Sequence, residues 1–241
     1  MNWEHLFSLE ERAFYTSFLM EFCSLLLIGI YFLNPQKSKS TGFLVILAIS
    51  SLTQVLLVQN NELRYGNAAY NKYLAQRLMY IYLVIEIFCC LLYVRTYTRL
   101  FIPKWLMLGS AIVYSIYAIA YWSLHFMVKY LPFHIEITEG GIIILFCLYF
   151  FIELFTQRTD KPLLQEPSFW AISGMLFLFS ALTPLFLLFE YLRENYKAFS
   201  YRIYAINNVA YSILFITFTI TILLNRKKNE PSFHYPNYYP S

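Results

Sequence analysis

The residues best suited to chemistry lie in one apolar stretch near the middle of the chain, Tyr80 to Tyr93. A single carboxylate, Glu86, stands near its centre, with Tyr82 and Cys90 one helical turn away on either side. In a helix these side chains and Tyr93 share one face, so their polar atoms can be turned inward together. This face suits either hydrogen bonding between helices or a site that responds to a ligand or proton, and both interpretations remain open.

Composition indicates the kind of element that must position this face. Of the 241 residues, 59% are hydrophobic and only 13% are charged, against about 45–50% and about 25% in ordinary soluble domains. The apolar residues fall in blocks of roughly 18 to 25, the length that crosses ~30 Å of hydrocarbon as a helix. The composition therefore excludes an ordinary soluble domain.

The blocks predict an all-α, polytopic membrane protein, a bundle of seven transmembrane helices in a single domain over residues 1–241. The expected helices cover roughly residues 9–33, 42–58, 75–94, 103–124, 141–157, 168–191 and 201–225, followed by a short tail over residues 226–241. The third helix carries the Glu86 face, and the other helices form walls around it.

The orientation follows from the loops. The larger share of the 18 Lys and Arg residues falls on the side that includes Arg95, Lys104 and Arg226, and most loop Asp and Glu fall on the other side. Cytoplasmic loops are enriched in Lys and Arg. We therefore expect the N-terminus outside and the C-terminus in the cytoplasm.

Three carboxylates lie within apolar segments: Glu21, Glu86 and Glu153. An ionised carboxylate in hydrocarbon costs from ~2.5 to over 10 kcal/mol by different estimates, so each should face the interior, water or a partner. Glu153 lies near a helix end, where we expect it to reach the interface or pair with a loop. Glu21 suits hydrogen bonding between helices, and Glu86 is the deepest.

Polar residues of other helices are candidate partners for Glu86. We expect a polar central cavity lined by the first, second, third, sixth and seventh helices, with Pro184 as a hinge in the sixth. The candidate ligand- or proton-responsive residues are Glu86, Glu21, Tyr82, Gln54, Ser180, Asn208 and Ser212.

The segment between the fourth and fifth helices, from His125 to Gly141, contains the pattern His134-x-Glu136-x-x-Glu139. We expect this segment to be an external loop, in which the pattern is either solvated or binds a divalent cation. The four cysteines lie in apolar segments without CxxC spacing, so we predict no structural metal site and no disulfide framework.

Motifs of catalysis and cofactor binding are missing from the chain. No phosphate-binding G-x-x-x-x-G-K-[ST] loop, dinucleotide fingerprint or G-x-S-x-G elbow occurs. The net charge of +4 is spread over loops, which gives no basic surface for nucleic acid. We therefore expect no catalytic residues, no cofactor and no nucleic-acid partner.

Three stretches resemble small bacterial seven-helix membrane proteins of uncharacterised function: Tyr80-Ile-Tyr-Leu-Val-Ile-Glu86, Glu166-Pro-Ser-Phe-Trp170, and Ile206-Asn-Asn208 through Leu224-Asn-Arg-Lys-Lys228. The layout is also similar to the membrane input modules of bacterial histidine kinases. This resemblance implies the bacterial inner membrane and a separate cytoplasmic signalling partner, such as a histidine kinase, at the basic end of the last helix.

A second resemblance is to PQ-loop transporters of the SWEET type, on the stretch Pro35-Gln36-Lys-Ser-Lys-Ser-Thr-Gly42. Those proteins carry a second Pro-Gln in their fifth helix, whereas residues 141–158 contain no proline. The dipeptide also follows Asn34 past the apolar span, where Asn-Pro ends a helix.

The sequence thus predicts a non-enzymatic membrane sensor that relays binding of a small ligand or proton to a cytoplasmic partner. A small-solute or proton-coupled transporter is the rival, and a structural or assembly protein is a third alternative.

Overall fold

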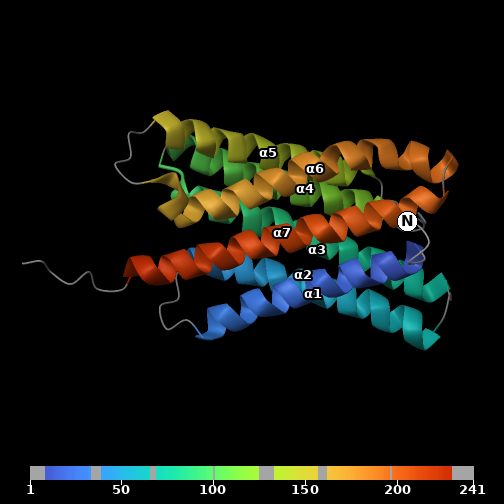
Figure 1. Ribbon diagram of the computed structural model, residues 1–241. Coiled ribbons are helices and arrows are strands. Elements are labelled where there is room, and N and C mark those ends of the chain that lie inside the picture. The colour runs from blue at the N-terminus through green and yellow to red at the C-terminus, as the bar shows by residue number, and fades with distance from the viewer. Residues whose placement is uncertain are drawn as a thin grey trace, which may run out of the picture.

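A computed structural model of the chain describes residues 9–33, 39–65, 69–99, 101–124, 133–156, 162–195 and 197–229. These ranges contain helices and no strand, so the all-α prediction is confirmed for them. The helices are α1 (Leu9–Leu33), α2 (Lys39–Tyr65), α3 (Ala69–Tyr97), α4 (Phe101–Leu124), α5 (Phe133–Thr156), a 3-10 turn η2 (Leu163–Gln165), α6 (Pro167–Asn195) and α7 (Lys197–Asn229). They lie side by side in one bundle (Figure 1).

Six helices, all except α2, contain stretches long and apolar enough to cross a membrane. The apolar stretch of α2 is shorter and runs from Ser40 to Leu56. The chain therefore has the character of a multi-pass membrane protein. Helix α3 lies deepest, since 56% of the residues in its apolar window are buried, against 22% in α1.

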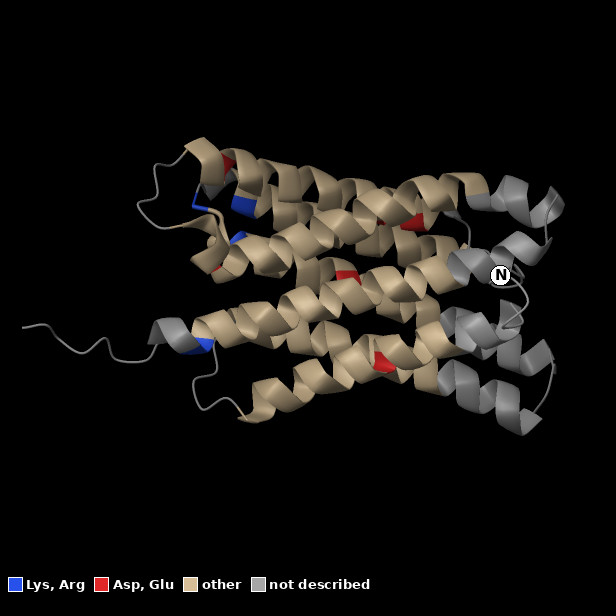
Figure 2. Cartoon of the chain, in the orientation of Figure 1, with Lys and Arg blue, Asp and Glu red and all other residues tan. Residues whose placement is uncertain are grey.

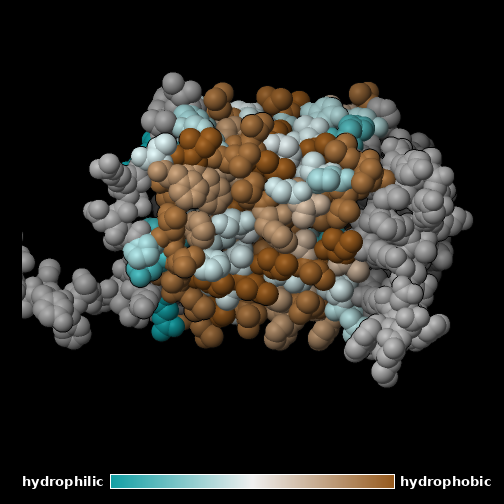
Figure 3. Space-filling view, turned by 45° about the horizontal axis from the view of Figure 1, so that its top comes forward, coloured by the Kyte–Doolittle hydropathy of each residue, from teal (hydrophilic) through white to brown (hydrophobic). Residues whose placement is uncertain are grey.

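The surface of the bundle is apolar. Side chains such as Val113, Ile116 and Leu145 are exposed on α4 and α5, and a brown, hydrophobic band covers the middle of the face in Figure 3. In water a band of this extent would be unfavourable, whereas lipid tails cover it without cost. Lipid contact therefore accounts for the outside of the bundle.

Helix α5 begins earlier than expected. Residues 133–141 form its first turns and are not part of an external loop. The cause is visible in the spacing of its buried side chains, because Glu136, Glu139, Ile143, Cys147 and Phe150 follow one another at three- and four-residue intervals on one buried face. The expected external loop is therefore wrong for residues 133–141, and its two glutamates, Glu136 and Glu139, are buried side chains of α5.

Two glycines let neighbouring helices approach closely. A Cβ atom added to Gly140 of α5 would collide with Thr183 of α6, and one added to Gly174 of α6 would collide with Thr217 of α7. Small residues at crossings are how membrane helices gain van der Waals contact without a hydrophobic driving force. The α5–α6 and α6–α7 pairs are built on this contact.

The side chain of Glu153 accepts a hydrogen bond from the backbone at the end of α3. The backbone N–H of Arg99, just past α3, donates to Oε1 of Glu153 on α5 at 2.8 Å. Arg99 lies past the last residue of α3, so its N–H needs an acceptor outside the helix, and this bond ties the end of α3 to α5. The expected pairing of Glu153 with a loop is confirmed.

Four Lys and Arg side chains lie together at one end of the bundle. Arg95, Arg99, Lys104 and Arg226 lie where α3 and α7 end and α4 begins, and Figure 2 shows the basic positions there while acidic positions occur along the helices. This end corresponds to the side that the sequence predicts to be cytoplasmic.

We predict that Gly140→Ala lowers the free energy of unfolding by about 1–3 kcal/mol, because the new methyl group overpacks the contact with Thr183. Gly141→Ala is the matched control, since its Cβ would meet no atom within 4 Å, and it should be neutral or stabilising by up to about 1 kcal/mol. Thermal unfolding of both variants in lipid nanodiscs measures the difference. Equal effects of the two substitutions would contradict the close crossing.

Candidate functional site

Glu86 lies at the centre of the bundle and is held by two tyrosines. Tyr82, one turn earlier on α3, donates its hydroxyl to Oε1 of Glu86 at 3.1 Å. Tyr211 of α7 donates to the same oxygen at 2.8 Å. The side chain of Glu86 is 1% exposed. Both bonds place O–H dipoles toward the carboxyl oxygen, which offsets part of the cost of removing it from water.

The helix face predicted around Glu86 is buried along its whole length. Tyr82, Glu86, Cys90 and Tyr93 are each at most 5% exposed. Successive members are three or four residues apart, so one stripe of α3 points into the bundle and places polar atoms among apolar neighbours. Glu86 therefore faces the interior together with the other polar residues of this stripe.

Helix α5 brings two further carboxyl groups into the interior. Glu139 is 1% exposed and its Oε2 accepts a hydrogen bond from the hydroxyl of Tyr114 on α4 at 3.2 Å. Glu136, one turn nearer the start of α5, is 9% exposed. Within the described residues, Oε2 of Glu136 and Oε1 of Glu139 are buried without a hydrogen-bond partner.

The three carboxyl groups act on one another electrostatically. Glu86 lies within electrostatic range of both Glu136 and Glu139, and we call these three residues the carboxyl cluster. The titratable groups around it are Tyr80, Tyr82, Cys89 and Cys90 of α3, Tyr114 of α4, Cys147 of α5 and Tyr211 of α7. None of these groups is basic, so no cation from the described residues balances the cluster.

This arrangement is suited to holding protons. Like charges in a low-dielectric interior repel strongly, so three carboxylates without a cation are far more stable when protons are shared among them. No group of three His, Cys, Asp or Glu in the described parts of the chain has the geometry to hold a metal ion. The chemistry that these residues offer is reversible protonation together with hydrogen bonding.

Three predicted partners of Glu86 instead form contacts elsewhere. Gln54 of α2 donates to the sulfur of Met79. Asn208 of α7 donates to Thr16 of α1 at 3.4 Å, and the buried Ser212 donates to the backbone carbonyl of Asn208 at 2.8 Å. These residues fasten α2 to α3 and α7 to α1, or satisfy their own helix.

Glu21, Ser180 and Pro184 form no hydrogen bond with the carboxyl cluster among the contacts of the described residues. Glu21 is half-buried on α1 and accepts a hydrogen bond from Ser17 at 3.3 Å. Ser180 and Pro184 are exposed on α6. Pro184 follows Thr183, the residue that contacts Gly140, so the predicted hinge adjoins the α5–α6 crossing next to Glu139 and is not in hydrogen-bonding contact with the cluster.

The residues that the sequence predictions missed are Glu136, Glu139, Tyr114 and Tyr211. For the two glutamates a signal exists, since the apolar period of α5 continues backward through both positions. For the two tyrosines no comparable signal exists, because the chain has 22 tyrosines and many stand near helix ends. The sequence predicts that α1, α2 and α6 line the polar site around Glu86, whereas in the structure α4 and α5 contribute its other polar groups.

No protein-family model, curated protein or solved structure matches this chain, so function is inferred from the site residues themselves.

We predict that Tyr211→Phe destabilises the fold by about 0.6–1.7 kcal/mol, the range for hydrogen bonds between membrane helices. Combined with Glu86→Gln in a double-mutant cycle, it should show a coupling energy of similar size. Tyr117→Phe is the control, since that ring lies on the outer side of α4 against Tyr121 and His134. A coupling energy near zero would mean that the α3–α7 bond contributes nothing.

Proposed function

We propose that this chain is a multi-pass membrane sensor in which the carboxyl cluster binds and releases protons and thereby changes the packing of α3 against α5 and α7. The observation that carries the proposal is the burial of three mutually interacting carboxyl groups without a described basic partner. Neutralisation by a proton removes most of the cost of such burial, so the occupancy of the cluster follows the pH to which it has access.

In this proposal protons reach the carboxyl cluster from the end of the bundle at which α5 begins. Glu136 is the fourth residue of the helix, and Glu139 lies one turn deeper. At a rise of about 1.5 Å per residue, these positions are about 4.5 Å and 9 Å from the helix start. Together with Glu86 they form a series of carboxyl groups that leads inward from the end opposite Arg95 and Arg226. With the N-terminus outside, as the sequence favours, the protons come from the outer side.

The proposed conformational change is transmitted along α7. Tyr211 joins Glu86 to this helix, which continues without interruption to Asn229 at the basic end of the bundle. When the cluster loses protons, electrostatic repulsion between α3 and α5 increases. The hydrogen bond from Tyr211 to Glu86 becomes charge-assisted and therefore stronger. The resulting shift of α7 is available to a cytoplasmic partner, for which a histidine kinase is our candidate.

A proton-coupled transporter of a small solute is the second candidate. The buried oxygens of Glu136 and Glu139 that accept no hydrogen bond within the described residues favour it, because a solute N–H or O–H group would satisfy them. Both functions use the same protons and differ in whether a solute crosses the membrane.

We expect Glu86→Gln and Glu139→Gln to abolish a pH-dependent movement of α7 relative to α3. Spin labels on Arg99→Cys and Arg226→Cys, both exposed, report the distance in liposomes, while the four native cysteines are buried. Glu21→Gln is the matched control, since it removes a carboxyl group from a membrane helix outside the cluster, and it should retain the wild-type response.

The outcomes separate the candidates. A distance that does not depend on pH in the wild-type protein would overturn the sensor proposal. Solute uptake driven by a pH gradient in liposomes without any partner, and lost in Glu139→Gln, would favour the transporter. Variants that change thermal stability and nothing else would indicate a purely structural role for the cluster.

A further inference from the structure

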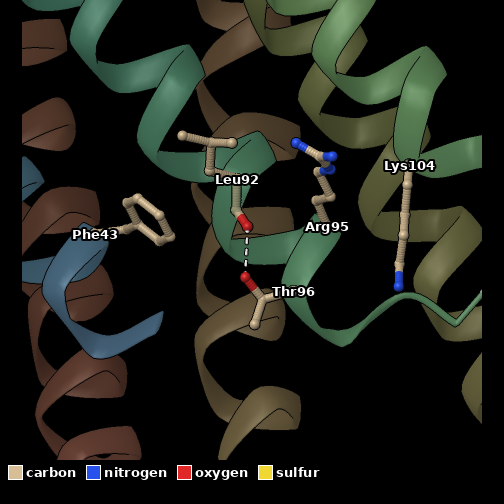
Figure 4. A pocket seen from close by; sticks show the side chains of 5 residues that line it. All are labelled: Phe43, Leu92, Arg95, Thr96 and Lys104. Atoms are coloured by element: carbon tan, nitrogen blue, oxygen red, sulfur yellow. Dashed lines mark hydrogen bonds between the residues drawn. The ribbon is translucent and has the colours of Figure 1, made fainter. Parts of the chain in front are cut away.

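A pocket of about 340 Å³ opens at the basic end of the bundle, far along α3 from the carboxyl cluster. Its lining comes from three helices: Phe43 from α2, Leu92, Arg95 and Thr96 from α3, and Lys104 from α4. Figure 4 shows Phe43 on one side, Arg95 and Lys104 on the other, and the end of α3 between them. The pocket therefore has an apolar wall and a cationic wall.

The cationic wall carries two positive charges. Within the described residues, no carboxylate forms an ion pair with Arg95 or Lys104. The guanidinium carbon of Arg95 lies 5.8 Å from the ring centre of Trp105, a cation–π contact that orients the side chain without neutralising it. Both charges remain available to an anion.

The other lining residues offer little to a polar ligand. The hydroxyl of Thr96 donates to the backbone carbonyl of Leu92 at 2.8 Å, so its proton is used within α3. The side chains of Phe43 and Leu92 are hydrocarbon, and the carbonyl oxygen of Leu92 already accepts the hydrogen bond from Thr96. A ligand that satisfies both walls must combine an anionic group with a hydrocarbon portion.

The position of the pocket along the bundle axis matches the level of lipid headgroups. Arg95 is in the last turn of α3, Lys104 is in the first turn of α4, and Phe43 is near the start of the apolar stretch of α2. The exposed Trp105 beside them is typical of the boundary between hydrocarbon and headgroups. The two charges therefore lie where lipid phosphates lie, with the apolar wall at the level of acyl chains.

We propose that this pocket binds the phosphodiester of an anionic phospholipid, with Arg95 and Lys104 on the phosphate and the first acyl carbons against Phe43 and Leu92. The guanidinium provides paired N–H donors that match phosphate oxygens, and the lysine adds a point charge. This site is separate from the carboxyl cluster, so it stands whether or not the chain is a proton sensor.

The test uses the full-length protein in nanodiscs of phosphatidylcholine with increasing phosphatidylglycerol, with lipids retained after gentle extraction counted by native mass spectrometry. The wild-type protein should retain phosphatidylglycerol in preference to phosphatidylcholine. A Lys or Arg side chain that contacts the lipid phosphate contributes roughly fivefold in affinity, so Lys104→Gln should weaken retention about fivefold and Arg95→Gln with Lys104→Gln about 25-fold. Arg99→Gln is the matched control at the same end of α3 and should leave the preference for phosphatidylglycerol nearly unchanged, because the side chain of Arg99 does not line the pocket.

Competition identifies the source of the phosphate. Inorganic phosphate and glycerol 3-phosphate at millimolar concentration should fail to displace the lipid, because neither contacts the apolar wall. Displacement by either at low concentration would overturn the lipid assignment in favour of a soluble phosphate ligand. Equal retention of the two lipids, or equal loss in Arg99→Gln and Lys104→Gln, would overturn the site itself. If the double variant unfolds, the Lys104→Gln variant alone tests the site. The side chain of Lys104 is only half-buried, so its replacement should leave the fold intact.

Discussion

Glu86 accepts hydrogen bonds from Tyr82 of its own helix and from Tyr211 of α7, and this shared acceptor connects the most buried helix to the C-terminal one. The bundle must supply these donors because a carboxyl group without partners at this depth would oppose folding. Glu139 has a donor in Tyr114 of α4 for the same reason. Four helices thus converge on three acidic side chains, and their relative positions follow from these contacts.

The outside of the bundle is apolar, unlike that of a soluble protein, and its largely apolar interior also encloses carboxyl and hydroxyl groups. Leucine, isoleucine and phenylalanine cover the outside, while carboxyl and hydroxyl groups are enclosed. Association of the helices therefore depends on close approach at Gly140 and Gly174 and on specific hydrogen bonds, since lipid tails compete equally for apolar contact. The close α5–α6 crossing at Gly140 lies next to the carboxyl cluster, because Gly140 directly follows Glu139.

The sequence was sufficient for the class of fold and for the buried stripe of α3, because hydrophobic length and helical period are local properties. It was also sufficient to identify Glu86 and Tyr82 as neighbours. The prediction of an external loop from His125 to Gly141 was wrong for Glu139, because the apolar period of α5 continues backward through this charged position. Tyr211 was beyond prediction, because which of many tyrosines faces α3 depends on the rotation of α7, a property set by packing against α1 and α6.

The bond between Glu153 and the backbone of Arg99 gives the α3–α5 pair an unusual mechanical character. It lies 14 residues beyond Glu139 on the same helix, about 21 Å away along the axis. The two helices are thus joined by this bond near one end and carry the carboxyl cluster toward the other. In the proposed mechanism, repulsion between α3 and α5 would therefore tilt the two helices about Glu153 and would not separate them evenly along their length.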